Sequence, residues 1–505
     1  MAEKYFQQNN WLYGLSESET SGGLGYFSKS FGVDIHTIPG VLRAAVAPQK
    51  ESGAIVTDFC KFAVDASRGT TTTVQQSFWF GDNGQIYRRL ITTSGLVSWG
   101  TTYFHSPTVN INGAWEFNSY IYWTSAGSIH RISLDDALRG EWGSGSVTLG
   151  WGTLNNTDYH SSVIIGTYCL ISNGTTIASI GDTGTITASG IPNVALAHLP
   201  ANYEITSLHK YGIDVLVGTK IKGGISGAKL LRWDIASPAF TQDIDVPESI
   251  VNCFLTTNNR TYLQAGNKGK IYEYNGVSVS PFKKIPMLND DAVSEENTLV
   301  FPQSSTNYYG IGYWGVSNQT GSSLFAIPGI YALGKRNEKY PISLSHQFVP
   351  SVVNESNTDV RIGAVISGRH HNTQIPYLVF SWKDATVPSY GIDAIHNNVN
   401  KFSGAYIETQ AISGNSQTQK TFGNHVVSYK ALPASTNISC EYYKNFSSGT
   451  SGVISLTNKS DYNNMVSNQK IEAGAMKYRL SLITSASSTP EISAFYTDWN
   501  EKSVL

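Results

Sequence analysis

The chain has 505 residues, which is too many for one ordinary hydrophobic core and predicts two or three domains. Its formal net charge is -2, and because the Lys and Arg residues are scattered, nucleic-acid binding through counterion release has little support. Charged residues make up only 14%, while aromatic residues reach 12% and Gly is abundant, which indicates an all-β protein and argues against disorder.

The first residues and the cysteines limit the class of protein further. Residues 1–8 have no apolar signal core, and no run approaches the roughly eighteen apolar residues of a membrane helix. We therefore expect a protein that is made in the cytoplasm and does not insert into a membrane. No CxxC pattern occurs, so we interpret the four cysteines as small buried apolar residues; they are Cys60, Cys169, Cys253 and Cys440.

Residues 1–39 are predicted to form an N-terminal segment that ends in a strand. Residues 32–38 alternate like a strand, with Val33 and Ile35 on one face. Pro39-Gly40 then makes a turn, and a strand resumes at Val41-Leu42.

A short phrase recurs between residues 40 and 339: an apolar strand, a turn containing Gly, and a second strand with Ile or Leu near its start. Copies occupy residues 78–87, 120–130, 168–177, 215–233 and 262–272, and a looser copy occupies 313–327. The apolar positions of the second strand are separated by 43, 48, 54, 40 and 53 residues; they are Ile86, Ile129, Ile177, Leu231, Ile271 and Leu324.

Such a period in an all-β chain predicts a β-propeller over residues 40–339. We expect six blades, or seven if residues 10–50 form part of another. The strand at residues 32–38 would close the ring by pairing with the last blade, because closure removes a free sheet edge. One short helical turn is expected at Leu134 to Leu138, with Ser133 as its cap.

From about Tyr340 the phrase stops and the expected strands become longer, which predicts a β-sandwich over residues 340–505. The charged stretch at residues 334–339 suits a linker between the two domains. The expected strands are residues 358–368, 375–382, 402–412, 418–431 and 477–485.

The last hundred residues carry a family resemblance at the level of strand motifs. The motifs are Tyr406-Ile407-Glu408-Thr409-Gln410, Lys420-Thr421-Phe422, Ala431-Leu432-Pro433, Asn437-Ile438-Ser439-Cys440-Glu441-Tyr442-Tyr443, the stretch 478–485, Pro490-Glu491-Ile492 and Tyr496. They resemble the C-terminal sandwich of tailed-bacteriophage virion proteins of the tail, baseplate or nozzle type, in which a propeller-like part precedes the sandwich. The resemblance implies a location in the virion, at the tail or the head–tail junction, and carries over no catalytic residue.

Acidic turns and pairs are the first candidates for catalysis, because sialidases and related glycosidases also use six-bladed propellers. Asp82-Asn83-Gly84 and Asp182-Thr183-Gly184 keep only the D-x-G part of the sialidase turn S-x-D-x-G-x-x-W, and we interpret both as hairpin turns. A glycosidase needs two carboxylates about 5 to 10 Å apart. The pairs Asp135-Asp136 and Asp290-Asp291 are chain neighbours in expected loops, which favours solvated patches.

The sequence evidence for a metal site or a phosphate site is equally weak. The adjacent side chains of His370-His371 would point to opposite faces of a strand, so we interpret them as part of a polar loop. The glycine-rich residues 222–227 lie between two strands with no helix after them, which favours a hairpin loop over a phosphate cradle. The sequence therefore predicts no catalytic residue, no cofactor and no metal.

Together these features predict a non-enzymatic structural component of a bacteriophage virion that acts through protein–protein contacts in a multi-copy assembly. Its expected partners are other virion proteins and copies of itself, without nucleic acid. The first alternative is a carbohydrate-binding adhesin or receptor-binding protein, in which Trp and Tyr of exposed loops stack on a host surface glycan. The second alternative is a propeller glycosidase.

Overall fold

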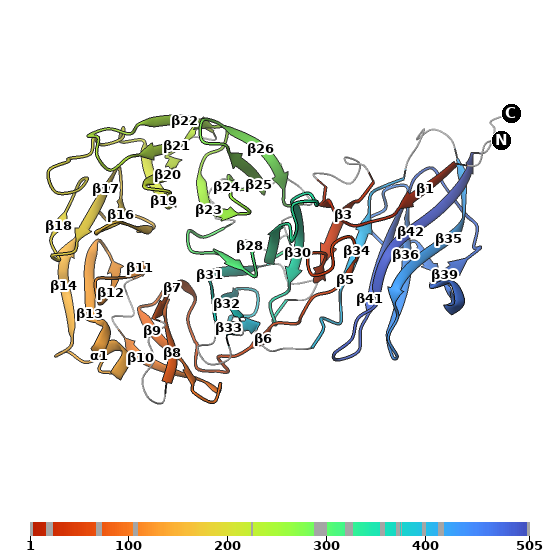
Figure 1. Cartoon of the computed structure of the whole chain (residues 1–505), viewed down its shortest axis with the longest axis horizontal. Coiled ribbons are helices and arrows are strands. Elements are labelled where there is room, and N and C mark those ends of the chain that lie inside the picture. Colours follow the sequence, from red (N-terminus) through yellow and green to blue (C-terminus); the bar gives the residue numbers. More distant parts are fainter. Residues whose placement is uncertain are drawn as a thin grey trace.

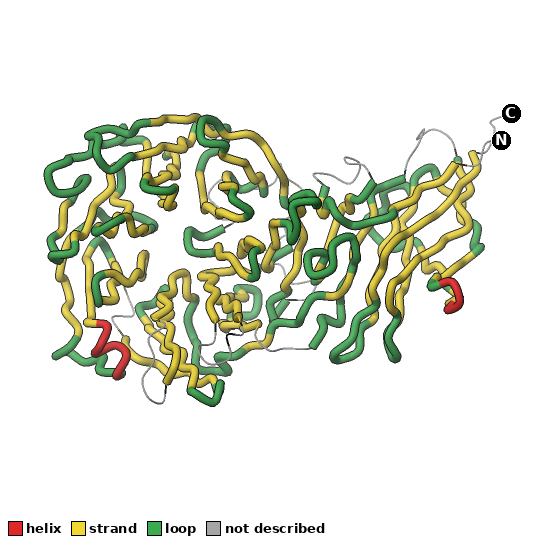
Figure 2. Tube along the Cα trace, in the orientation of Figure 1, coloured by secondary structure: helices red, strands yellow, loops and turns green. Residues whose placement is uncertain are grey.

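The computed structural model of the chain is all-β, as the composition predicted, with 59% of the described residues in strands and 2% in helices (Figures 1 and 2). It describes residues 4–16, 24–66, 73–104, 110–223, 226–286, 300–318, 327–353, 359–369, 374, 376–395, 400–412 and 419–501. One half of the molecule is a ring of small sheets, and the other half consists of two larger sheets (Figure 1).

Five antiparallel four-stranded sheets follow one another along the chain from residue 60 to residue 284. The first contains β7 (Cys60–Ala66), β8 (Thr73–Gly81), β9 (Gln85–Thr92) and β10 (Val97–Phe104). The second contains β11 (Ile111–Phe117), β12 (Tyr120–Ser125), β13 (Ser128–Ser133) and β14 (Val147–Thr153), and the third β15 (Ser162–Ile165), β16 (Tyr168–Asn173), β17 (Thr176–Gly181) and β18 (Ile186–Thr187). The fourth contains β19 (Tyr203–Tyr211), β20 (Asp214–Ile221), β21 (Ala228–Trp233) and β22 (Gln242–Val246), and the fifth β23 (Val251–Thr257), β24 (Arg260–Ala265), β25 (Lys270–Tyr274) and β26 (Val279–Lys284).

Two further four-stranded units complete the ring. The sixth contains β27 (Ser305–Tyr308), β28 (Ile311–Val316), β29 (Gly329–Gly334) and β30 (Ser343–Phe348). The seventh contains β31 (Val360–Arg369), β32 (Pro376–Asp384), β33 (Ser389–Ile395) and the N-terminal strand β6 (Gln49–Lys50). The first strands of the units contact one another in a closed circle, β7–β11–β15–β19–β23–β27–β31–β7. Four-stranded sheets around a common centre give the chain the character of a β-propeller.

The recurring phrase coincides with the second and third strands of the first five units. Its five regular copies fall on β8–β9, β12–β13, β16–β17, β20–β21 and β24–β25. The apolar residues of the phrase's second strand, which is the third strand of each unit, are almost fully buried, at 0% or 1% exposure; they are Ile86, Ile129, Ile177, Leu231 and Ile271. The apolar second strands of the units follow from burial, since β12, β16, β20 and β24 are buried along most of their length.

The strand that completes the last unit of the ring differs from the one expected at residues 32–38. β6 pairs with β33 through Gln49↔Ala394 and Lys50↔Asp393. β4 (Val33–Asp34) pairs instead with β5 (Arg43–Ala44) across the turn expected at Pro39-Gly40. Two paired residues are too short to give a periodic signal, which explains why the sequence missed β6.

The strands β31 to β33, which the sequence assigned to the second domain, pair within the ring instead. In the hairpin β32–β33, β32 is an apolar strand like the second strands of the other units. The turn of this hairpin, residues 385–388, contains no Gly. Asp384 shapes this turn in place of a Gly residue, because its Oδ1 accepts hydrogen bonds from the backbone N–H groups of Thr386 at 2.9 Å and Val387 at 3.3 Å. Because the recurring phrase was defined with a Gly in its turn, it did not identify this unit from the sequence.

The sheet of the sixth unit does not end at β30 but continues through six more strands. Its order is β27-β28-β29-β30-β2-β3-β34-β41-β36-β37. The added strands are β2 (Gly14–Leu15), β3 (Tyr26–Phe31), β34 (Tyr406–Thr409), β41 (Met476–Ile483), β36 (Asn437–Lys444) and β37 (Gly452–Ile454). The junction is parallel, with Gly14 paired to Leu344, and a Cβ on Gly14 would lie 2.2 Å from the Leu344 carbonyl oxygen. Only Gly fits at this position.

A second large sheet lies against this one, in the order β1-β42-β35-β39-β38, with β40 also paired to β35. Its strands are β1 (Lys4–Gln8), β42 (Glu491–Glu501), β35 (Lys420–Ala431), β39 (Asn464–Ser467), β38 (Thr457–Lys459) and β40 (Ile471–Ala473). Phe422, Val427 and Phe495 of this sheet share one buried cluster with Tyr478 and Leu480 of the ten-stranded sheet. The rings of Tyr478 and Phe495 lie 4.9 Å apart.

The short helical turn and the cysteines are further features predicted from the sequence that lie within the described residues. The expected helical turn is α1 (Leu134–Arg139), capped by Ser133, whose side chain accepts from the Asp136 N–H; a 3-10 turn, η2 (Ser460–Tyr462), lies before β39. All four cysteines are buried and free. No helix in the described part of the chain is long and apolar enough to cross a membrane.

Candidate functional site

The hub of the ring, the space enclosed by the first strands, is crossed by the segment at residues 300–304. Gln303 accepts a hydrogen bond from the Ala63 N–H of β7 at 2.9 Å and donates to the Ala114 carbonyl of β11 at 3.1 Å. Its own carbonyl accepts from the Val365 N–H of β31 at 3.0 Å. The neighbouring Pro302 carbonyl lies 3.4 Å from the Cys253 sulfur of β23, on the opposite side of the ring. Five consecutive residues therefore tie together four of the first strands.

The aromatic side chain of this segment is packed at the same end of the hub. Phe301 is 5% exposed, and its ring lies 5.6 Å from Phe59 and 6.2 Å from Tyr159. Lys61 lies over the Tyr159 and Phe301 rings and forms an ion pair with Asp82 at 2.8 Å. Burial alone would lower the pKa of Lys61, but Asp82 outweighs it and the pKa is raised. This end of the hub is a packed polar and aromatic cluster.

The joint between the first and seventh units is a second polar cluster. Arg89 donates to both carboxylate oxygens of Glu51, at 2.5 and 2.9 Å, and lies over the Tyr377 ring at 5.1 Å. The Trp99 indole N–H donates to Glu51 at 3.2 Å, and Tyr377 donates to Asp65 at 3.1 Å. Glu51 directly follows the closing strand β6, so this buried ion pair fastens the closing strand to the first unit. A cavity of about 320 Å³ lies beside it, lined by Gln49, Lys50, Glu51, Gly95, Leu96, Val97 and Ala394.

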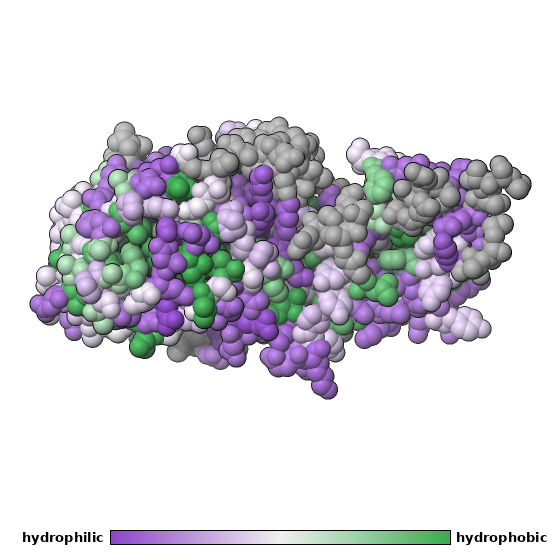
Figure 3. Space-filling view, turned by 90° about the horizontal axis from the view of Figure 1, so that it is seen from above, coloured by the Kyte–Doolittle hydropathy of each residue, from purple (hydrophilic) through white to green (hydrophobic). Residues whose placement is uncertain are grey.

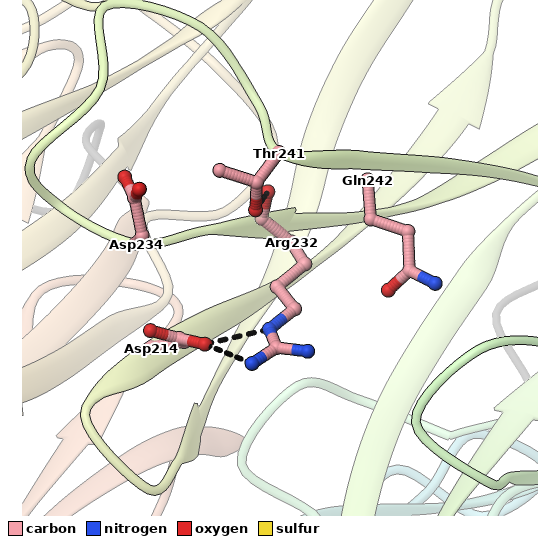
Figure 4. A pocket seen from close by; sticks show the side chains of 5 residues that line it. All are labelled: Asp214, Arg232, Asp234, Thr241 and Gln242. Carbon is pink, nitrogen blue, oxygen red and sulfur yellow. Dashed lines mark hydrogen bonds and ion pairs between the residues drawn. The ribbon is translucent and has the colours of Figure 1, made fainter.

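A larger cavity of about 410 Å³ lies on the fourth unit, near the ends of β20, β21 and β22 (Figure 4). It is lined by Asp214, Arg232, Asp234, Thr241 and Gln242. Arg232 donates through Nε to Asp214 Oδ2 at 2.6 Å, and its Nη2 contacts the same oxygen. The guanidinium also lies over the Tyr211 ring at 5.4 Å.

Asp234 and Gln242 form the fixed walls of this cavity. Asp234 accepts from the Ala236 and Ser237 N–H groups at 3.0 and 2.8 Å and from the Ser237 hydroxyl at 2.8 Å. Burial would raise the pKa of Asp234, but these hydrogen bonds outweigh it and lower the pKa below its ordinary value. Gln242 accepts from the Tyr274 hydroxyl at 2.6 Å.

This arrangement suits binding better than glycoside hydrolysis. A glycosidase needs one carboxylic acid that holds its proton near neutral pH. Asp234 has the opposite shift, and Asp214 is paired with the Arg232 guanidinium. Asp234 therefore does not suit the role of proton donor, and the Asp214 carboxylate is engaged by its ion pair.

The candidate residues named from the sequence do not meet in one place. Asp82 and Asp182 lie at hairpin turns whose Gly84 and Gly184 have φ of 81° and 77°, so the turn interpretation is confirmed. The pair Asp135-Asp136 lies in the first turn of α1, the helical turn expected at Leu134 to Leu138, rather than in the loop expected for the acidic pair, and carboxylates there are favourable to the helix dipole. Asp290-Asp291, His370-His371, Leu324 and residues 224–225 of the glycine-rich stretch lie outside the described residues.

Sequence reasoning missed Asp214 and Arg232, although Asp214 borders a copy of the recurring phrase and Arg232 lies within it. Charged residues at hairpin ends are ordinary solvated positions, so the pattern itself gave no reason to select them. Within the described residues, no group of three or more His, Cys, Asp or Glu side chains is placed to hold a metal ion.

Comparisons with known proteins show similarity of fold at most. No protein-family model and no curated protein matches the chain. Among solved structures, the computationally designed Ika8 protein has a TM-score of 0.39 and 12% identity, covering 69% of this chain and 99% of that one. The β-propeller domain of Myceliophteria thermophila Cps50 (Swd1) has a TM-score of 0.40 and 10% identity, with coverage of 70% and 99%. YCF48 bound to D1 peptide has a TM-score of 0.41 and 9% identity, with coverage of 70% and 95%.

Similarity at these levels carries no functional argument. None of the comparisons points to a bacteriophage virion protein, so the resemblance of the last hundred residues stays a prediction.

Proposed function

We propose that this protein is a non-enzymatic structural component of a bacteriophage virion, associated with the tail, and that it acts through protein–protein contacts in a multi-copy assembly. We further propose that its ring is a seven-bladed propeller and that its two large sheets form a C-terminal β-sandwich. The predicted boundary at residue 339 then moves to the end of β33, with β6 as the outer strand of the last blade.

The ten-stranded sheet is the observation that carries this proposal. It runs without a break from β27 at the hub to β37 in the C-terminal half. The two halves are joined through the pair Gly14↔Leu344 and through the His346 N–H, which donates to the Ser30 hydroxyl of β3 at 3.0 Å, whereas domains joined only by a linker move relative to each other. A rigid body of this kind suits a part that transmits position between neighbours in an assembly.

The edges and exposed apolar side chains support contacts with neighbours. β1 and β38 are edge strands of the second large sheet, and an edge strand offers unpaired N–H and C=O groups to another chain. Tyr5 of β1 is 63% exposed, and Tyr462, after β38, is 78% exposed. Hydrophobic side chains also gather in several separate patches on the ring half (Figure 3). Exposed aromatic residues are typical of protein interfaces.

Quantitative mass spectrometry of purified phage particles tests this function. We expect the chain in the particles at a fixed ratio of more than one copy per particle, and the ratio should survive a high-salt wash. A chain absent from particles, or one removed by washing, would rule out the structural role.

A further inference from the structure

We infer that the cavity beside Asp214 and Arg232 binds a neutral saccharide through two adjacent hydroxyl groups. The inference goes beyond the proposed assembly role, because it concerns a ligand rather than a neighbouring virion protein. It rests on the polar groups that face the cavity, on their charge, and on the apolar side chains that flank it.

The polar groups of the cavity include a hydrogen-bond acceptor, on Asp214, and a donor, on Arg232 (Figure 4). Both contacts from Arg232 use Oδ2 of Asp214, and within the described residues Oδ1 has no hydrogen-bond partner. The Arg232 side chain is 34% exposed, whereas Asp214 is 10% exposed. A carboxylate oxygen accepts from one hydroxyl, while a guanidinium donates to the next. Adjacent hydroxyls on a sugar ring present this pair of groups.

Thr241 adds a third polar group to the same wall. Its hydroxyl donates to the Arg232 carbonyl at 3.1 Å, which fixes its direction and leaves its oxygen able to accept. The backbone beneath it is held as well, because the Thr241 N–H donates to the same carbonyl at 2.8 Å. The array is therefore ordered before a ligand arrives, which lowers the entropic cost of binding.

The charge of the cavity disfavours an anionic ligand. Two carboxylates, Asp214 and Asp234, face one guanidinium, Arg232, so the lining carries one excess negative charge. The lowered pKa of Asp234 keeps that carboxylate ionised near neutral pH. Phosphorylated, sulfated and carboxylated ligands would meet repulsion here.

Two exposed apolar side chains belong to residues next to the lining of the cavity. Ile213, next to Asp214 in the hairpin, is 80% exposed, and Val277 is 75% exposed. The Val277 carbonyl accepts from the Gln242 side chain at 2.9 Å, which places Val277 beside the cavity. The ring of a sugar has an apolar C–H face and a polar rim, and it therefore matches a polar wall with aliphatic flanks.

A glycan array of neutral, amino and acidic oligosaccharides tests the inference with the full chain. We expect wild-type protein to retain neutral oligosaccharides, and Asp214→Asn and Arg232→Lys to weaken binding at least about tenfold. The matched control is Arg260→Lys, which alters an ion pair with Glu273 outside the cavity and should bind normally. Periodate, which cleaves the carbon–carbon bond between adjacent hydroxyls, should abolish retention of the same oligosaccharides.

The exposed flanks give a second test that does not depend on the stability of the ion pair. The double variant Ile213→Ala/Val277→Ala should fold like wild type, as its circular dichroism melt would verify, and should bind several-fold more weakly. Failure of wild-type protein to retain any oligosaccharide overturns the inference. So does retention of acidic oligosaccharides alone, or equal binding by wild type, Asp214→Asn and Arg232→Lys.

Discussion

Glu51→Gln should destabilise the ring at the joint between its first and seventh units. Arg89 is 2% exposed and Glu51 10% exposed, so the change leaves a buried guanidinium without its counter-charge. Removing one partner of a buried ion pair costs about 3 to 5 kcal/mol. β6 contributes only two paired residues to its sheet, and hydrogen bonds between residues 51–52 and Ile392 extend this pairing, so the ion pair is the link from the closing strand to the first unit.

Urea unfolding followed by tryptophan fluorescence measures this effect, because Trp99 contacts Glu51 directly. The matched control is Asp245→Asn, which alters an exposed ion pair with Lys229 and should change stability by less than about 0.5 kcal/mol. The double variant Glu51→Leu/Arg89→Met removes both charges and should recover most of the loss. The reasoning is refuted if Glu51→Gln unfolds at the wild-type urea concentration, or if the double variant is the less stable of the two.

The remaining predictions concern the hub and the buried histidines. Phe301→Ala should cost about 3 to 5 kcal/mol of unfolding free energy, because it empties a packed site where the first strands meet; Phe446→Ala, at a side chain that is 51% exposed, is the control. Stability should also fall as the pH drops from about 6.5 towards 4, since burial lowers the pKa of His36, His209 and His346 to about 4 while the unfolded chain takes up protons near 6.5. Asp58 and Asp393 oppose this loss, because burial raises the pKa of each to about 6, so the folded state gains protons below that pH. Between pH 6.5 and 5, His346→Gln should therefore lose about 1.6 kcal/mol less stability than wild type, as urea unfolding at the two pH values would measure.

Each of these predictions has a contrary outcome. Equal losses for Phe301→Ala and Phe446→Ala would mean that residues 300–304 do not brace the hub. Parallel stability–pH curves for wild type and His346→Gln would mean that this histidine takes up its proton equally in the folded and unfolded states.

The sequence predicted the elements that are marked by a local pattern of apolar, turn or capping residues. The copy at β24–β25 has apolar strands around a Gly-containing turn, and both strands are buried by adjacent sheets. The cap of α1 was equally visible, because a Ser three residues before an acidic residue satisfies a free N–H group through local contacts. Local patterns of this kind need no knowledge of distant partners.

Long-range pairings could not be predicted in the same way. β6 pairs with β33 some 340 residues later, and a two-residue strand has no period of its own. The turn after β32 uses Asp384 in place of Gly, so the seventh unit fell outside the pattern. Asp214 and Arg232 meet only because the hairpin β20–β21 sets their register, Val215↔Trp233 and Leu216↔Arg232. In the sequence, each of the two residues resembles an ordinary solvated charged residue near a hairpin, and nothing indicates that they meet.

Immunogold electron microscopy of phage particles, with an antibody raised against this chain, tests the central claim most directly. A structural tail component predicts label confined to the tail or to its junction with the head. Absence of label from both intact and dissociated particles, while the same antibody labels the purified chain, would contradict the virion role and leave saccharide binding as the activity to pursue.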